Sequence, residues 1–190
     1  MALSGVFFCV ACASAPRAQL NVTGEAHELP PEELYFPLHD GHIFHYTVRG
    51  QDGRAGMLIT KVARTDASAS LTSGGRVTRL TVRGDGIYND SGFYFLKLPL
   101  KLGAEWSGQS GVVSVVRVGQ TVETGAGNFV DCVVTRETTQ GTVEIRQVET
   151  TFCPNVGLVR LEVQALGAAP SAVELATLEY FGPPIDVSAL

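Results

Sequence analysis

The histidines are the first residues of this chain that could do chemistry, because all four lie between positions 27 and 45. Three of them follow at equal spacing, His39, His42 and His45, and Asp40 stands beside the first. Imidazole and carboxylate groups together suit zinc, copper or nickel. A strand beginning at His42 would, however, place His42 and His45 on opposite faces, with His39 in the preceding turn. We therefore expect solvated surface histidines, and a metal site on His39, His42 and His45 is the alternative.

Motifs of established catalytic chemistry are missing from the sequence. It contains no Gly-x-Ser-x-Gly, His-Glu-x-x-His, phosphate loop or dinucleotide fingerprint. Its 14 basic and 19 acidic residues give a net charge of −5, which offers no positive field to nucleic acid. With 45% hydrophobic residues the chain is too apolar for a disordered tail. We expect one folded domain that is not an enzyme and uses no cofactor.

The first 15 residues form an apolar run that ends in small residues, a pattern typical of a secretory signal. The run is shorter than the roughly 20 apolar residues of a membrane-spanning helix. Within it, Cys9-Val10-Ala11-Cys12 resembles the lipobox of bacterial lipoproteins, which implies lipid attachment at Cys12. The residues after Cys12 then imply an outer-membrane lipoprotein facing the periplasm or the cell surface. Ordinary cleavage after Ala13 or Ala15, giving a soluble secreted or periplasmic protein, is the alternative.

Two further cysteines, Cys132 and Cys153, belong to the folded body, and an oxidising compartment would permit them to pair. A tight turn at Gln140-Gly141 would put Cys132 opposite Glu149 and leave Cys153 about 13 Å away along its strand. A disulfide tolerates a Cα separation of only about 7 Å. Pairing therefore needs a longer turn, a bulge or another strand arrangement, and two buried thiols are the alternative.

The body of the chain is predicted to be all-β. Strand-like segments recur at the spacing expected of an antiparallel barrel, half-barrel or sandwich, and segments such as 143–148 and 158–163 alternate polar with apolar residues. Two short segments, 31–34 and 67–71, are the only candidates for helix. The expected strands are 42–49, 56–63, 76–83, 92–98, 112–118, 128–137, 142–152, 157–165 and 173–181. We expect four regions: a signal or lipobox segment (1–15), a tether (16–33), one antiparallel domain (34–183) and a tail (184–190).

Aromatic residues lie on or beside these strands, and they could line a cavity that holds one small apolar ligand. Phe44, Tyr46 and Trp106 are the candidates for such a lining. The alternative is that they fill a solid core.

One internal repeat stands out, which we call the Pro-Leu repeat. Its copies are Phe36–Phe44 and Leu98–Trp106, and both follow the pattern apolar-Pro-Leu-x-x-Gly-x-x-aromatic. Such a segment combines an extended approach, a glycine turn and an aromatic residue that enters the core. We expect it to be a structural device that starts a hairpin.

The repeat and two other segments resemble those of uncharacterised bacterial envelope lipoproteins. Residues 35–46 match Tyr-[Tyr/Phe]-Pro-Leu-x-x-Gly-x-x-Trp-x-Tyr, and 99–106 match its Pro-Leu-x-x-Gly-x-x-Trp core. Residues 124–132 match a Pro-Ala-Gly-x-Phe-x-x-Cys segment, and 152–159 match Tyr-x-Pro-Gly-Val-Gly-Leu-Val. Phe44, Gly125 and Asn155 depart from those patterns. The resemblance implies an all-β envelope domain, and it supplies no catalytic residue.

The sequence thus predicts an exported, lipid-anchored envelope protein that acts as a non-catalytic binding or structural module. Its partner would be the membrane through the lipid anchor, together with an envelope protein, a polymer or an apolar small molecule. A metal-binding protein or metal-dependent enzyme that uses the three histidines is the alternative function.

Overall fold

The computed structural model describes residues 29–50, 52–140, 145–166 and 174–185, and every regular element in these ranges is a strand. This confirms the all-β prediction. The part of the chain so described holds no helix with the length and hydropathy of a membrane span. The strands are β1 (Ile43–Arg49), β2 (Ala55–Thr65), β3 (Ser68–Ser73), β4 (Arg76–Arg83), β5 (Gly86–Asn89), β6 (Tyr94–Lys97), β7 (Glu105–Ser107), β8 (Gly111–Thr124), β9 (Gly127–Gln140), β10 (Ile145–Cys153), β11 (Gly157–Leu166) and β12 (Glu174–Gly182).

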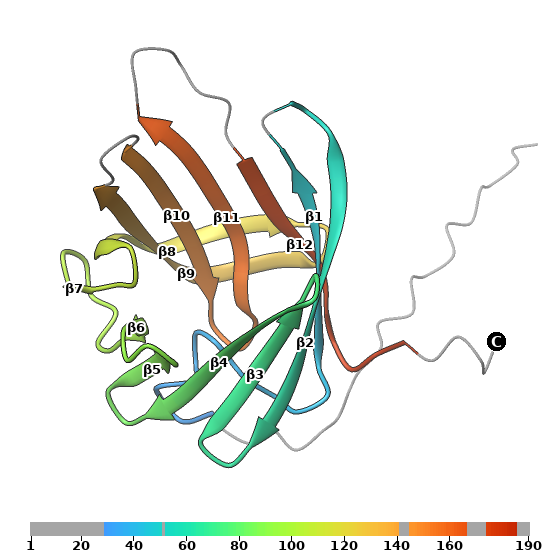
Figure 1. Cartoon of the computed structure of the whole chain (residues 1–190), viewed down its shortest axis with the longest axis horizontal. Coiled ribbons are helices and arrows are strands. Elements are labelled where there is room, and N and C mark those ends of the chain that lie inside the picture. The colour runs from blue at the N-terminus through green and yellow to red at the C-terminus, as the bar shows by residue number, and fades with distance from the viewer. Residues whose placement is uncertain (1–28, 51, 141–144, 167–173, 186–190) are drawn as a thin grey trace, which may run out of the picture.

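All twelve strands form one antiparallel sheet that curls into a nearly closed barrel (Figure 1). Two meanders of consecutive strands, β1–β6 and β7–β12, are joined where β1 pairs with β12. The end strands β6 and β7 approach each other without forming a ladder. The side chain of Asn89 crosses this seam and donates a hydrogen bond to Gln109 at 3.0 Å. The barrel therefore closes through side chains on one side and through backbone pairing elsewhere.

The two copies of the Pro-Leu repeat occupy equivalent places, because each leads into the first strand of a meander. Gly41 and Gly103 both adopt positive φ, at 74° and 81°, a conformation that suits glycine. Gly41 donates its backbone N–H to the carbonyl of Val62 at 3.1 Å, and Gly103 does the same to Val115 at 2.9 Å. The repeat is thus one turn used twice, which fastens the start of each meander to its second strand.

The segment before β1 closes one end of the barrel, and it lies in the lower part of Figure 1. Phe36 from this segment packs against the ring of Phe95 at 4.9 Å between centroids and against the rings of Phe44 and Phe152. Gly157 opposes it with φ 104°, and a Cβ there would meet the Phe36 ring at 3.2 Å. The aromatic cluster therefore seals this end with apolar side chains.

Glu33 fixes the same segment to the barrel. Its side chain is buried, and its carboxylate accepts hydrogen bonds from both terminal nitrogens of the Arg64 guanidinium on β2. Arg64 also donates to the carbonyl oxygens of Leu38 and Asp66. We expected residues up to 33 to form a tether, so the structure adds Glu33 to the packed domain.

Three short strands were not predicted from the sequence. β5 and β7 are too short for a periodic signal, at 4 and 3 residues. β3 covers most of segment 67–71, which we had considered as a helix. Hydrogen bonding to β2 on one side and β4 on the other makes it a strand, so its neighbours override weak local preference.

Candidate functional site

A cavity of about 400 Å³ opens inside the barrel, a size within the range of small-molecule sites. Its apolar wall comes from the segment before β1 and from strands on both sides of the barrel. Aromatic rings form one part of this wall and aliphatic side chains the other. The apolar lining residues are Phe36, Phe44, Tyr46, Leu58, Leu71, Phe95, Leu158, Leu161 and Ala176.

Tyr46 presents its ring to this cavity while its hydroxyl is already engaged. The hydroxyl donates a hydrogen bond to the carbonyl of Leu158 at 3.1 Å. Burial raises the pKa of Tyr46 far above its usual value, so the phenol stays neutral. Tyr46 therefore contributes an apolar surface and no charge.

A polar rim lies on the β2–β4 side of the cavity. Thr60 donates a hydrogen bond to the hydroxyl of Ser73 at 3.0 Å, and Thr78 lines the same wall. Arg76, at the start of β4, is exposed and is the only charged residue among the described lining residues. None of the ion pairs found among the described residues involves Arg76. The site thus combines a large apolar surface with one unpaired cation at its edge.

A second, smaller chamber of about 230 Å³ adjoins the first, and the two share Phe95, Leu158 and Leu161 as lining residues. This chamber is more polar, and Glu137 is the carboxylate on its wall. Glu137 accepts a hydrogen bond from the backbone N–H of Ser110 at 2.8 Å. The smaller chamber therefore has a carboxylate on its wall, whereas the larger cavity has an arginine at its rim.

The structure brings two of the three expected aromatic residues to the cavity. Phe44 and Tyr46 lie on its wall, on the inner face of β1. Trp106, which we expected beside them, lies instead in a separate buried cluster with Val113, Val115 and Val133. The reason is topological: Trp106 ends the second copy of the Pro-Leu repeat and lies on β7, the first strand of the other meander. Leu58 and Arg76 had no motif that could have marked them as lining residues.

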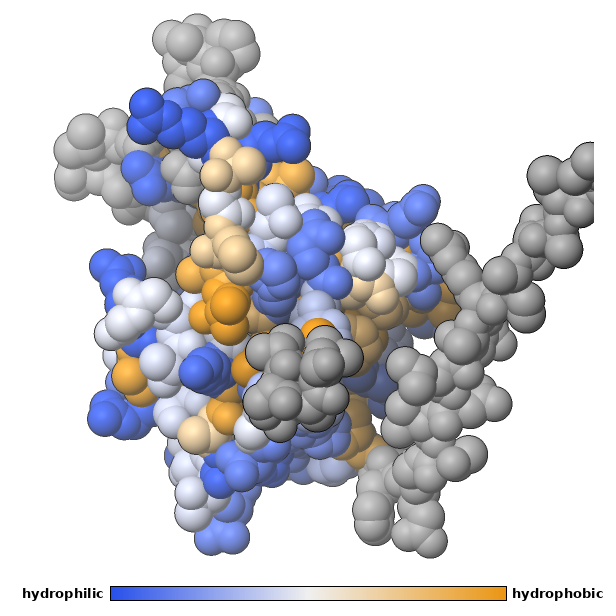
Figure 2. All heavy atoms as spheres, turned by 90° about the vertical axis from the view of Figure 1, so that its right-hand side faces the viewer, coloured by the Kyte–Doolittle hydropathy of each residue, from blue (hydrophilic) through white to orange (hydrophobic). Residues whose placement is uncertain are grey.

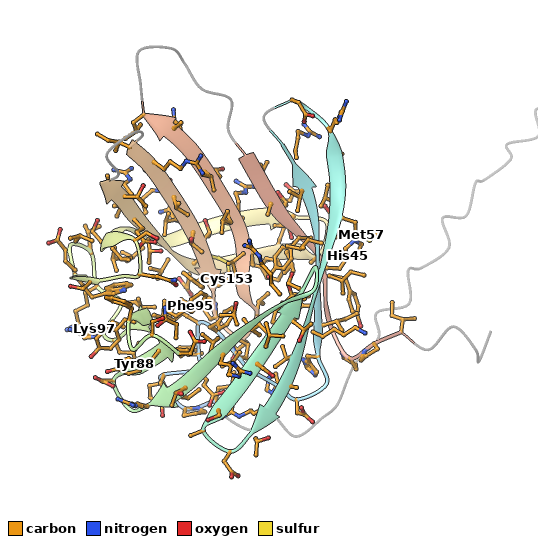
Figure 3. The ribbon with its side chains drawn as sticks, in the orientation of Figure 1. His45, Met57, Tyr88, Phe95, Lys97 and Cys153 are labelled. Atoms are coloured by element: carbon orange, nitrogen blue, oxygen red, sulfur yellow. A yellow bond between two sulfur atoms is a disulfide. The ribbon has the colours of Figure 1, made fainter. Side chains whose placement is uncertain are left out.

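The histidines do not converge. The rings of His39 and His42 lie 4.8 Å apart, whereas His45 lies on β1 near Met57 at the right of the barrel (Figure 3). Burial, and secondarily the charge of His39, lowers the pKa of His42. Asp40 accepts a hydrogen bond from the backbone N–H of Arg64 at 2.8 Å. Among the described residues no three histidine, cysteine or acidic side chains are grouped so as to hold a metal ion.

Cys132 and Cys153 form a disulfide, with their Cα atoms 4.2 Å apart. The tight turn that we considered at Gln140-Gly141 is wrong, because β9 and β10 pair with Gln140 opposite Ile145. This register moves Cys153 opposite Cys132. Both cysteines are fully buried, in the same cluster as Phe36 and Phe44, and Figure 3 shows Cys153 close to Phe95, which packs on Phe36 at the closed end. The disulfide therefore fastens the closed end.

A tyrosine cluster lies on β5 and β6, on the opposite side of the molecule from Met57 (Figure 3), and its Tyr94 also lines the smaller chamber. Tyr94 and Tyr88 stack at 4.2 Å between centroids, and both donate hydrogen bonds to Asp85, at 2.7 and 2.8 Å. These hydrogen bonds lower the pKa of Asp85. Arg83 covers the ring of Tyr88, and Lys97 covers that of Tyr94. Because the outer ring faces are already occupied, we interpret this cluster as an anchor for β5 and β6.

The outer surface near β2 carries exposed apolar side chains, of which Met57 is 66% and Ile59 44% exposed. Figure 2 shows hydrophobic residues among hydrophilic ones on this side of the molecule. Cys12, the predicted lipid attachment site, lies outside the described residues, as do His27 and the rest of segment 1–28.

Two solved structures resemble this chain. A Parabacteroides distasonis protein classed as a lipoprotein is 13% identical with a TM-score of 0.53, and the alignment covers 78% of this chain and 98% of that protein. A Bacteroides fragilis protein classed as exported, with a YmcC-like fold, is 13% identical with a TM-score of 0.49, covering 78% and 99%. No protein-family model matches the sequence, and no curated protein matches it. The likeness to the first structure shows a shared fold.

Proposed function

We propose that this chain is an exported, lipid-anchored envelope protein whose barrel binds an apolar small molecule without catalysis. The observation that carries the proposal is the cavity of about 400 Å³, walled by Phe36, Phe44 and Phe95 inside the barrel. A concave apolar surface with a few polar groups at its edge is typical of a small-molecule site. A barrel whose interior was completely filled by side chains would instead favour a purely structural role.

Three observations support the envelope setting. The segment before Cys12 has the pattern of a lipoprotein signal. The disulfide between Cys132 and Cys153 suits an oxidising compartment. One solved structure with the same fold is that of a protein classed as a lipoprotein.

Binding is tested with N-phenyl-1-naphthylamine, a neutral apolar dye that fluoresces strongly when it leaves water. We expect saturable binding to the purified domain. Ala176→Phe should weaken binding at least fivefold, because the new ring occupies the cavity. Thr177→Phe is the matched control, since the next residue along β12 points to the other face of the sheet.

Leu71→Phe repeats the test from another strand, so that a folding defect in one variant does not decide the outcome. Far-ultraviolet circular dichroism of each variant checks that the strands are retained. Absence of dye binding by the wild-type domain would overturn the proposal. Unchanged binding in both filled variants that remain folded would also overturn it, because the dye would then lie elsewhere.

The lipid anchor is tested separately by mass spectrometry of the full chain extracted from bacterial membranes. We expect a diacylglyceryl group on Cys12, and its loss together with release from the membrane in Cys12→Ser. An unmodified soluble protein that begins after Ala13 or Ala15 would contradict the anchor and leave dye binding unaffected.

A further inference from the structure

We propose that the cavity selects a single-chain amphiphile with an anionic head group, held with the head at Arg76 and the chain against the aromatic wall. This inference rests on the proposed function and names the chemical class of its ligand. The anionic group is a carboxylate or a phosphate, since the guanidinium of arginine binds both through its planar set of N–H donors.

The charge on the cavity wall is the first argument. Among the described residues that line the cavity, Arg76 is the only one with a formal charge, and none of them is a carboxylate. The chain as a whole carries a net charge of −5, so a cation at this edge does not reflect a generally basic surface. An arginine without an ion-pair partner beside an apolar surface provides a binding position for an anion.

The change in polarity along the strands is the second argument. On β4 the side chains that face inward change from Arg76 through Thr78 to Leu80, which is 1% exposed. On β3 they change from Ser73 through Leu71 to Ala69, which is buried. Both strands therefore run from a polar edge to an apolar interior. A molecule with one charged end and one apolar chain has the same gradient.

The position of Arg76 is the third argument. Arg76 pairs with Ser73 at the end of the β3–β4 hairpin, whose turn residues Gly74 and Gly75 have φ values of 54° and 81°. The hairpin holds the arginine backbone at the rim while its side chain remains exposed to solvent. An anionic head at this rim keeps part of its hydration, so its desolvation costs less than it would in the barrel interior.

The second chamber favours one orientation of the bound ligand. Its wall carries Glu137, and a carboxylate there disfavours an anionic head. An anionic amphiphile is therefore expected to place its head at Arg76 and to direct its chain toward Phe95, Leu158 and Leu161, the residues that the two chambers share.

The test compares four ligands of equal chain length: dodecanoate, dodecyl phosphate, dodecanol and dodecylamine. Each displaces N-phenyl-1-naphthylamine from the purified domain at about pH 8, where the carboxylate is ionised and the amine is protonated. We expect one or both anions to bind about fivefold more tightly than dodecanol, as a largely exposed ion pair allows. The two anions together identify which head group is preferred.

Variants at the rim then assign the preference to Arg76. Arg76→Gln should remove the advantage of the anion over dodecanol while dodecanol binds as before. Arg76→Glu should reverse the preference, so that dodecylamine binds more tightly than either anion. Arg79→Gln is the matched control, because Arg79 lies on the same strand and does not line the cavity.

Four results would overturn the inference. Three of them leave the proposed function intact: equal binding of dodecanol and both anions by the wild-type domain, an anion preference that survives in Arg76→Gln, or failure of all four ligands to displace a dye that does bind in the cavity. The fourth, absence of dye binding, refutes the proposed function and this inference with it.

Discussion

The disulfide gives the sharpest stability prediction, because Cys132 and Cys153 join two neighbouring strands at the closed end of the barrel. Two perturbations separate the stability due to the cross-link from that due to the buried sulfur atoms. Reduction of the wild-type protein removes the cross-link and keeps both sulfur atoms. Cys132→Ala combined with Cys153→Ala removes the cross-link and the sulfur atoms together.

The magnitude follows from the length of chain that the cross-link closes. The two cysteines are 21 residues apart, and closing a loop of this length in the unfolded chain stabilises the folded state by about 3 kcal/mol. Loss of two buried sulfur atoms adds about 1 kcal/mol in the double alanine variant, because both side chains are fully buried. We therefore expect reduced wild-type protein to be intermediate between the oxidised protein and the variant.

The assay is equilibrium unfolding in urea, followed by the fluorescence of Trp106, the single tryptophan of the chain. A loss of about 3 kcal/mol should lower the midpoint by roughly 1 M urea. Titration of free thiols in the unfolded state, without reductant, checks the starting material, since the paired cysteines should not react.

Equal midpoints for oxidised and reduced wild-type protein would refute this reasoning. So would two reactive thiols at positions 132 and 153 in unreduced protein exported to an oxidising compartment. An equal loss in the reduced protein and the double variant would refute only the term assigned to the buried sulfur atoms.

Three further predictions concern residues that hold the barrel, each measured by urea unfolding. Glu33→Gln should lower the free energy of unfolding by about 2 kcal/mol, because Arg64 then loses the carboxylate that it contacts with two nitrogens. A decrease of less than about 0.5 kcal/mol would contradict this. Gly157→Ala should lower the free energy of unfolding by about 2 kcal/mol, because the backbone has a positive φ there and the new Cβ would crowd the Phe36 ring. Gly53→Ala is the control, since Gly53 also has a positive φ but no atom lies within 4 Å of the added Cβ, so its decrease should be smaller. Equal decreases would show that the contact with the Phe36 ring does not matter. Burial alone would raise the pKa of Glu149, but hydrogen bonds from two arginines outweigh it and hold that pKa below its usual value. Glu149→Gln should therefore be less stable than wild type at neutral pH, and the two proteins should become equally stable as the pH falls below about 4. A stability difference that stays constant with pH would contradict the assignment.

The strand pattern was predictable where alternation was strong. Residues 143–148 and 158–163 alternate polar with apolar side chains, and β10 and β11 contain most of these segments. The pairing of the cysteines was left open because Gly141 is typical of a tight turn, whereas the observed register pairs Gln140 with Ile145. β3 was not predicted because Ser and Ala give it little strand preference, and its two neighbours supply the hydrogen bonds.

The candidate site was only partly predictable, for a different reason. Phe44 and Tyr46 could be assigned to an inner face by alternation along one strand. Arg76 could not, because an arginine after a Gly-Gly turn is ordinary on any exposed hairpin. Its importance depends on which strand lies across the barrel, and this is a long-range property of the twelve-stranded sheet.

The motifs and the cavity rim lie at different ends of the barrel, and this difference bears on what the resemblance can predict. Tyr35 and Phe36, the disulfide and Gly157 all belong to the motif segments and build the closed end. Arg76 lies at the rim and belongs to none of them. A resemblance carried by these motifs therefore predicts the scaffold and its closed end. Ligand preference should depend instead on the rim, so exchange of the hairpin residues around Arg76 should change the preferred head group while the barrel keeps its stability.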